Sequence, residues 1–160
     1  MSCIGSVPDG QLIDTASVGD HTFTVTATDA AGNTRTETRI YRVVFAFSGF
    51  HQPVDNPPVL NTLNAGRAVP VKFNLGGNHG LMIFMSGYPA TTQIDCALGT
   101  ALAEVEQTTT TAGANSLSYD PAADQYVYTW NTESAWAGTC RRLTVKLADG
   151  TTHTANFKLR

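Results

Sequence analysis

The sequence is poor in charged side chains and in long apolar runs, and each shortage excludes a class of protein. Only 14% of the 160 residues are charged and the net charge is −3, with no basic run, so we expect no nucleic-acid partner. The apolar runs fall far short of the roughly 20 residues of a membrane-spanning helix, so we expect no membrane insertion. The opening MSCIGSVPDG lacks the regions of a signal peptide. If the protein is exported, we therefore expect this chain to be a piece of a longer one.

Cysteine occurs only three times, with no spacing typical of a zinc knuckle or a CxxC redox pair. The odd count fits one disulfide and one remaining thiol. Cys96 and Cys140 each flank a candidate strand, so we predict a bond between them that ties two β-layers together. Closing so long a loop stabilises by about 4 kcal/mol in the chain-entropy view. Such a bond indicates an oxidising compartment.

What the sequence has in quantity is alternation of apolar and polar residues, which is typical of half-buried strands. The organising stretch is 65–77, AGRAVPVKFNLGG, in which alternate residues from Val69 to Leu75 are apolar. We predict one buried strand here, closed by a Gly-Gly turn. Because Pro70 has no backbone donor, the strand should lie at a sheet edge or begin beyond its pairing region.

A first hairpin is predicted from residues 21–28 and 34–44, joined by the loop DAAGN. The run GSVPDGQLIDTASVGDHTFTVTATDAAGNTRTETRIYRVV resembles the C-terminal half of a bacterial hyalin-repeat-like immunoglobulin module. The preceding strands of that module are missing, which implies that Cys3 is unpaired or paired outside this sequence. Glu37 and Arg39 stand where the family has aliphatic residues, and unpaired charges are costly in a sandwich core. We therefore expect this face to be partly open to water or covered by a different surface.

The register of the last hairpin follows from its alternation. A two-residue loop would pair Val145 with Thr154 and mix apolar with polar positions. A three-residue loop, Ala148 to Gly150, pairs Val145 with His153 and keeps one face apolar. We therefore predict the longer, bulged turn with Gly150 in the left-handed region.

Residues 49–158 resemble the PxKF domain, which is named for the motif formed here by Pro70, Lys72 and Phe73. The shared motifs are PVDNPP, NAGRAVPVKFNLGG, GYP followed by a cysteine, LSYD, YVYTW, WAGTC and LADGTTHTANF. The resemblance implies a fibronectin-like sandwich at the C-terminal end of an exported bacterial or archaeal multidomain protein, often behind immunoglobulin-like repeats. It carries over no catalytic residue.

Together these patterns predict an all-β protein, an immunoglobulin/fibronectin-like β-sandwich with a partial immunoglobulin-like β-hairpin segment at the N-terminus. The expected divisions are a partial segment over residues 1–44, an aromatic and proline-rich connector over 45–58, and a PxKF-like sandwich over 59–160. The aromatic residues of the connector are expected to pack between the two parts. Neighbouring immunoglobulin-like domains of a longer chain are the expected partners.

Four aromatic residues form the candidate ligand site: Tyr126, Tyr128, Trp130 and Trp136. Flat rings suit the apolar faces of pyranoses, so these side chains could bind a polysaccharide by stacking. Alternate residues of one strand more often face a core, however. The competing interpretation places Trp130 in the core and has Trp136 seal the loop before Cys140.

Other chemistry has weaker signals. The four histidines show no paired ligand spacing, and no GxSxG nucleophile motif is present, so we predict no metal site and no enzyme. Calcium is the only cofactor with candidate ligands, which are the turn residues Asp9, Asp14, Asp20, Asp29, Asp55, Asp120 and Asp124. No EF-hand spacing links them, and aspartate in turns commonly accepts local backbone hydrogen bonds. Lys72 could crosslink to an acid in a core, but it lies on the face opposite Val71 and Phe73, which favours a solvated role.

The sequence therefore favours a non-catalytic structural or adhesive module of a secreted or cell-surface bacterial or archaeal protein. The first alternative is a carbohydrate-binding module that uses exposed Trp and Tyr rings. The second is a self-assembling subunit, a homo-oligomer in which an open strand edge is completed by another chain.

Overall fold

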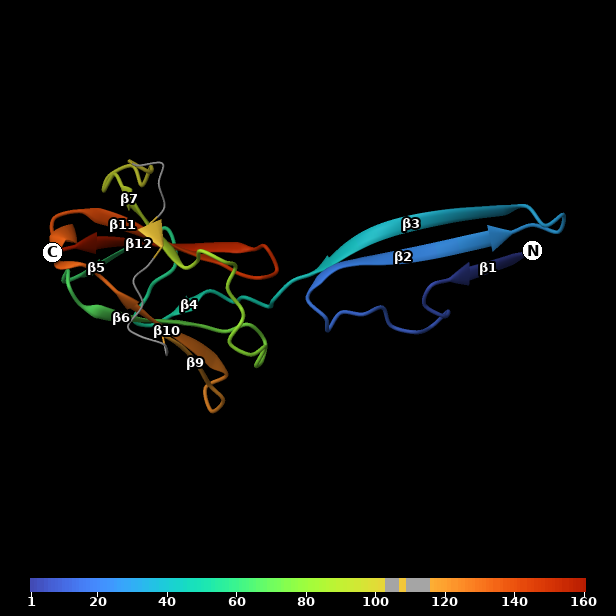
Figure 1. Ribbon diagram of the computed structural model, residues 1–160, viewed down its shortest axis with the longest axis horizontal. Helices are drawn as coiled ribbons and strands as arrows, with labels where there is room; N and C mark the ends of the chain where they lie inside the picture. The colour runs from blue at the N-terminus through green and yellow to red at the C-terminus, as the bar shows by residue number, and fades with distance from the viewer. Residues whose placement is uncertain (103–106, 109–115) are drawn as a thin grey trace. The chain divides into compact units, whose positions relative to one another are not determined.

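The computed structural model describes residues 1–102, 107–108 and 116–160 of the chain. These residues fold into two compact units, Met1–Phe45 and Ala46–Arg160. Strands dominate both units, and the described residues contain one short 3₁₀ turn, Ser134–Trp136, and no α-helix (Figure 1). The all-β prediction is confirmed. Across the described ranges, no helix has the length and apolar character required to cross a membrane.

The N-terminal unit is a three-stranded antiparallel sheet in the order β1-β2-β3. β2 (Gly19–Thr28) and β3 (Thr34–Val43) pair along their whole length, which confirms the predicted hairpin. β1 (Ser2–Gly5) pairs with the other side of β2. β1 has only four residues, too few for a pattern of alternating apolar and polar residues to identify it in the sequence. No residue of this fully described unit is buried, so the sheet has no core of its own.

The C-terminal unit contains two sheets. The first has the order β4-β6-β10-β9, with bounds β4 (Phe50–His51), β6 (Ala68–Phe73), β10 (Gln125–Asn131) and β9 (Leu117–Asp120). The second has the order β5-β12-β11-β7-β8, with bounds β5 (Leu60–Leu63), β12 (Thr152–Leu159), β11 (Cys140–Lys146), β7 (Ala90–Ile94) and β8 (Gln107–Thr108). Neighbouring strands are antiparallel except β5 and β12, which run parallel.

The inner faces of these two sheets form one aromatic-rich core. The ring of Trp130 on β10 meets that of Phe157 on β12, with centroids 4.7 Å apart. The apolar face predicted for β6 is confirmed, since Val69, Val71 and Phe73 are all buried. Full burial of each such side chain contributes about 1.5–3 kcal/mol relative to exposure.

Pro70 shows how an interior strand accommodates a missing donor. β6 lies between β4 and β10, so it is not the sheet-edge strand that was one of the two expectations. β4, however, pairs only with Lys72 and Phe73, and Pro70 lies beyond it. On the β10 side, Thr129 opposite Pro70 donates its N–H to Ser116, away from β6. The second expectation, that Pro70 lies outside the pairing region, is therefore correct for the β4 side.

The last hairpin has the predicted register. Val145 pairs with His153 and Leu143 with Ala155. Leu147 donates its N–H to the carbonyl of Thr151, which leaves the three-residue loop 148–150. Gly150 has φ 85°, a conformation that glycine adopts without steric cost.

The segment expected as a connector, 45–58, differs from that description. Its residues from Ala46 onward belong to the C-terminal unit, where β4 extends the first sheet. Phe50 is buried, and the ring of Phe47 contacts those of Phe50 and Phe73 within the same unit. Local pattern did not reveal this because a two-residue strand is defined by its partner, here β6, and not by alternation.

Candidate functional site

The predicted disulfide is present between Cys96 and Cys140, whose Cα atoms are 5.3 Å apart. Cys140 is the first residue of β11 and pairs with Ile94 at the end of β7. The bond therefore joins neighbouring strands of one sheet, and the expectation that it ties two β-layers was wrong. Cys3, on the N-terminal sheet, is a free and exposed thiol.

The four candidate stacking aromatics lie in the core. Tyr126 and Trp130 are 0% exposed, Tyr128 is 1% exposed and Trp136 is 5% exposed. A ring with no free face cannot stack on a sugar, so these four side chains form no sugar-binding platform in this structure. The competing interpretation is correct for Trp130. Trp136 lies beneath the guanidinium of Arg141, 4.7 Å from the ring centroid, in a cation–π contact.

The hydroxyl of Tyr126 is committed to the loop that follows β6. It accepts the backbone N–H of His79 and donates to the carbonyl of Gly80, at 2.6 and 3.0 Å. Burial raises the pKa of this tyrosine. The group therefore anchors a loop as a neutral hydroxyl, a structural role.

A second polar cluster closes the β9–β10 turn. The hydroxyl of Tyr119 donates to the carboxylate of Asp124, and the side-chain amide of Asn74 donates to the same carboxylate. The hydrogen bond to Asp124 raises the pKa of Tyr119 to about 12, and the Tyr119 and Asn74 bonds lower the pKa of Asp124. Asp124 has φ 50°, which this cluster holds in place. The Tyr119 hydroxyl, the Asn74 amide and the Asp124 carboxylate all have partners within the protein, so the cluster stabilises the β9–β10 turn.

Three of the seven aspartates proposed as calcium ligands accept hydrogen bonds within their own turns. Asp14 accepts the N–H groups of Ala16 and Ser17, and the Ser17 bonds are the largest cause of a pKa lowered to about 2. Asp29 and Asp120 accept turn N–H groups in the same way. Within the part of the chain that the structure describes, no three His, Cys, Asp or Glu side chains gather as a metal site. The turn interpretation accounts for these three residues.

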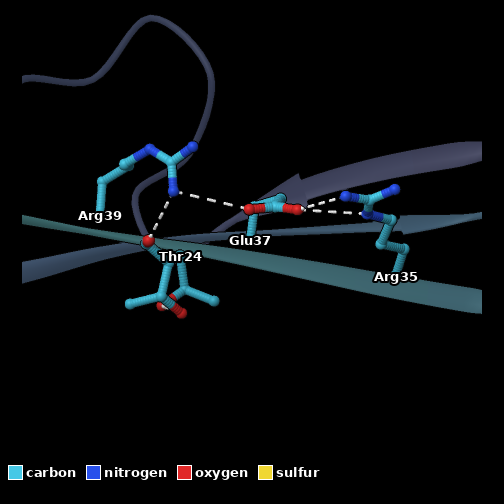
Figure 2. Close-up of polar contacts among 5 residues, drawn as sticks. Thr24, Arg35, Glu37 and Arg39 are labelled. Atoms are coloured by element: carbon cyan, nitrogen blue, oxygen red, sulfur yellow. Dashed lines mark hydrogen bonds and ion pairs between the residues drawn. The ribbon is translucent and has the colours of Figure 1, made fainter.

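An exposed charged ladder runs along β3, where sequence reasoning had singled out Glu37 and Arg39. The carboxylate of Glu37 accepts hydrogen bonds from Arg35, the shorter at 2.7 Å, and lies 3.5 Å from the guanidinium of Arg39 (Figure 2). The side chains of Arg35, Glu37 and Arg39 are 83%, 51% and 79% exposed. Of the two expectations for this face, partial exposure to water is the one that the structure shows. Arg35 was missed, although the alternating charges of RTETR signal the whole ladder.

The ladder shares its face with an apolar row. In the β2–β3 register, Arg35, Glu37 and Arg39 lie opposite Ala27, Val25 and Phe23. Phe23 and Val25 also line a groove of about 660 Å³ beside β1, together with Cys3, Val7 and Ile13 among others. One side of the N-terminal sheet is therefore half apolar and half charged.

The other side of the same sheet is a threonine ladder. The hydroxyls of Thr26 and Thr36 are 2.9 Å apart across the strands, and those of Thr24 and Thr38 are 3.4 Å apart. Cross-strand threonine pairs of this kind stabilise a sheet without requiring burial. They help explain how an unburied three-stranded sheet holds its register.

Comparisons with known proteins give no relative. No protein-family model, no curated protein and no solved structure matches the chain.

Proposed function

We propose that this protein is a non-catalytic structural or adhesive module of a secreted or cell-surface multidomain protein from a bacterium or archaeon. The observation that carries the proposal is the oxidised pair Cys96–Cys140, in which Cys140 is buried in the sandwich. Disulfides persist mainly in oxidising compartments, so this pair favours a site of action outside the cytosol.

The positions of the candidate aromatic, hydroxyl and carboxylate groups support a structural role. The large aromatic rings fill the core, the Tyr126 hydroxyl anchors a loop, and Asp14, Asp29 and Asp120 hold turns. The resemblance of residues 49–158 to the PxKF domain, and of the preceding run to half an immunoglobulin-like module, favours the same role. Neighbouring immunoglobulin-like domains of a longer chain are the proposed partners.

Surface labelling of the producing cells tests the proposal. Antibodies against the 160-residue chain should label intact cells or detect the protein in the culture fluid, and external protease should remove the surface signal. Mass spectrometry of the protein recovered from cells under thiol-blocking conditions should show Cys96 joined to Cys140 and Cys3 either free or in a separate bond. A protein found only in the cytosol, with Cys96 and Cys140 reduced, would refute the proposal.

A further inference from the structure

β3 is an edge strand whose outward backbone groups can be identified. The N–H of Asp29 donates to the carbonyl of Asn33 at the start of the hairpin, at 3.0 Å. Ladder bonds between antiparallel strands recur at every second residue pair. The odd-numbered residues of β3 therefore bond to β2, and its even-numbered residues direct N–H and C=O groups toward the open edge. In the part of the chain that the structure describes, no strand pairs with this side of β3.

The centre of the open edge is covered by a side chain of the same strand. The guanidinium of Arg39 donates to the carbonyl of Thr38 at 3.1 Å. This contact agrees with the outward direction of the Thr38 carbonyl. It is solvent-exposed and local, so a competing strand can replace it at small cost.

The charges of the ladder select one register for pairing β3 with a second β3. The faces of two antiparallel copies match only when residues of the same parity oppose each other. Centring the pair on Glu37 sets Glu37 against Glu37, and centring it on Arg39 sets Arg39 against Arg39. Centring it on Thr36 pairs Arg35 with Glu37 but uses only half of the strand before the hairpin turn intervenes. Centring it on Thr38 places Glu37 opposite Arg39 twice and pairs nearly the whole strand.

We propose that β3 binds β3 of a second copy of this chain, antiparallel and with Thr38 opposite Thr38, to form a continuous six-stranded sheet. Residues 34–42 of each copy pair, and their even-numbered residues exchange about ten backbone hydrogen bonds. Glu37 and Arg39 fall at positions of the narrower, non-hydrogen-bonded type, where opposed side chains are closest. Arg35 of each copy lies opposite Tyr41 of the other, in reach of a cation–π contact.

A second copy fits this edge better than an unrelated strand because the complementarity lies within RTETR itself. Charges on an edge strand ordinarily oppose pairing with other chains. Here they oppose the registers centred on Glu37 and Arg39 and favour the one centred on Thr38. A dimer through β3 would let the proposed structural module join two chains, and to that extent it rests on the proposed function.

Cysteine crosslinking of the full chain tests the register. In the variant Cys3→Ser/Thr38→Cys, the two cysteines meet at the symmetry axis with Cα atoms about 5.5 Å apart, within disulfide range. Mild oxidation should convert most of the protein to a covalent dimer. The matched control Cys3→Ser/Thr34→Cys carries its cysteine on the same strand and face. Its two cysteines would lie roughly 26 Å apart in the dimer, so it should remain unlinked.

Charge reversal tests the pairing itself, by sedimentation equilibrium of the full chain. Glu37→Arg should raise the dimer dissociation constant roughly tenfold or more, because two attractive cross-strand pairs become repulsive. The double variant Glu37→Arg/Arg39→Glu should return it to within about threefold of the wild-type value. Thr38→Pro removes an outward N–H and the hydroxyl that faces Thr24, but no N–H that bonds to β2, so it should abolish the dimer while the circular dichroism of the chain is retained.

A wild-type chain that stays monomeric at millimolar concentration and gives no Thr38→Cys crosslink would overturn the dimer. The register would be overturned if the Thr34→Cys variant crosslinked as fully as the Thr38→Cys variant. It would also be overturned if Glu37→Arg left the dimer dissociation constant unchanged. If a charge variant fails to fold, the crosslinking pair decides alone. A monomeric protein on the cell surface would refute the dimer only, whereas a reduced cytosolic protein would refute the proposed function.

Discussion

The ring of Phe47 lies flat against the imidazole of His153, with ring centroids 3.6 Å apart and planes 14° from parallel. The contact joins the start of the C-terminal unit to β12. Burial lowers the pKa of His153, although Asp149 acts in the opposite direction. The folded protein therefore favours the neutral ring.

This lowered pKa predicts a loss of stability in mild acid. The unfolded chain binds a proton at His153 near pH 6.5 and the folded chain only at lower pH, so stability falls as pH drops below about 6.5. Urea denaturation at pH 7.5 and 5.5 measures the difference. His153→Gln should reduce that difference, whereas Met82→Ala, at a side chain that is 91% exposed and does not titrate, should leave it unchanged. An unchanged pH dependence in His153→Gln would contradict the prediction.

Removing the disulfide should destabilise the C-terminal unit. The double variant Cys96→Ser/Cys140→Ser is expected to lose about 2–5 kcal/mol of unfolding free energy, because the unfolded chain regains the freedom of the closed loop. Cys3→Ser should change it by less than about 0.5 kcal/mol, since that thiol is exposed and unbonded. Guanidinium denaturation without reductant provides both values. Similar losses in the two variants would contradict a structural role for the bond.

Trp130 should behave as a core residue. Trp130→Ala is expected to cost about 3–5 kcal/mol, because it opens a cavity against Phe157. Met82→Ala, at a side chain that is 91% exposed, is the control and should be nearly neutral. Thermal denaturation compares them. A near-neutral Trp130→Ala would mean that the ring is not packed as the structure describes.

Asp29 should hold the β2–β3 turn. Its carboxylate accepts hydrogen bonds from the N–H of Ala31 and from both the backbone and side chain of Asn33. Asp29→Ala should destabilise the turn and speed amide exchange throughout β2 and β3, because this sheet has no buried core to compensate. Hydrogen exchange with mass spectrometry localises the effect. Asp9→Ala, in the loop after β1, should leave exchange in β3 unchanged.

The same Asp29 bonds predict acid sensitivity of the N-terminal unit. Hydrogen bonds from Asn33 are the largest causes of the lowered pKa of this carboxylate. Its contribution is complete above the unfolded pKa of about 3.9 and is lost as pH falls through the lower folded value. Amide exchange in β2 and β3, corrected for the intrinsic pH dependence, should rise in that window for the wild type and not for Asp29→Ala. A parallel rise in both proteins would contradict the assignment.

Much of the fold could be predicted because alternation is a local property. It located β2, β3, β6 and β10, and combined with loop length it fixed the register of the last hairpin. The cost of burying the charges of Glu37 and Arg39 indicated a face that is partly open to water or covered by a different surface. Cysteine position was sufficient to pair Cys96 with Cys140.

The sequence by itself thus determined which residues share a strand face and which two cysteines pair. Only the tertiary structure decided which face is buried. The sequence alternates in the same way whether the apolar residues of a strand face a core or form an exposed binding surface. That decision placed Trp130 in the core and left Glu37 in water. It also joined β4 to β6 and placed β3 at the edge of its sheet, since strand partners come from distant parts of the chain and no local pattern encodes them.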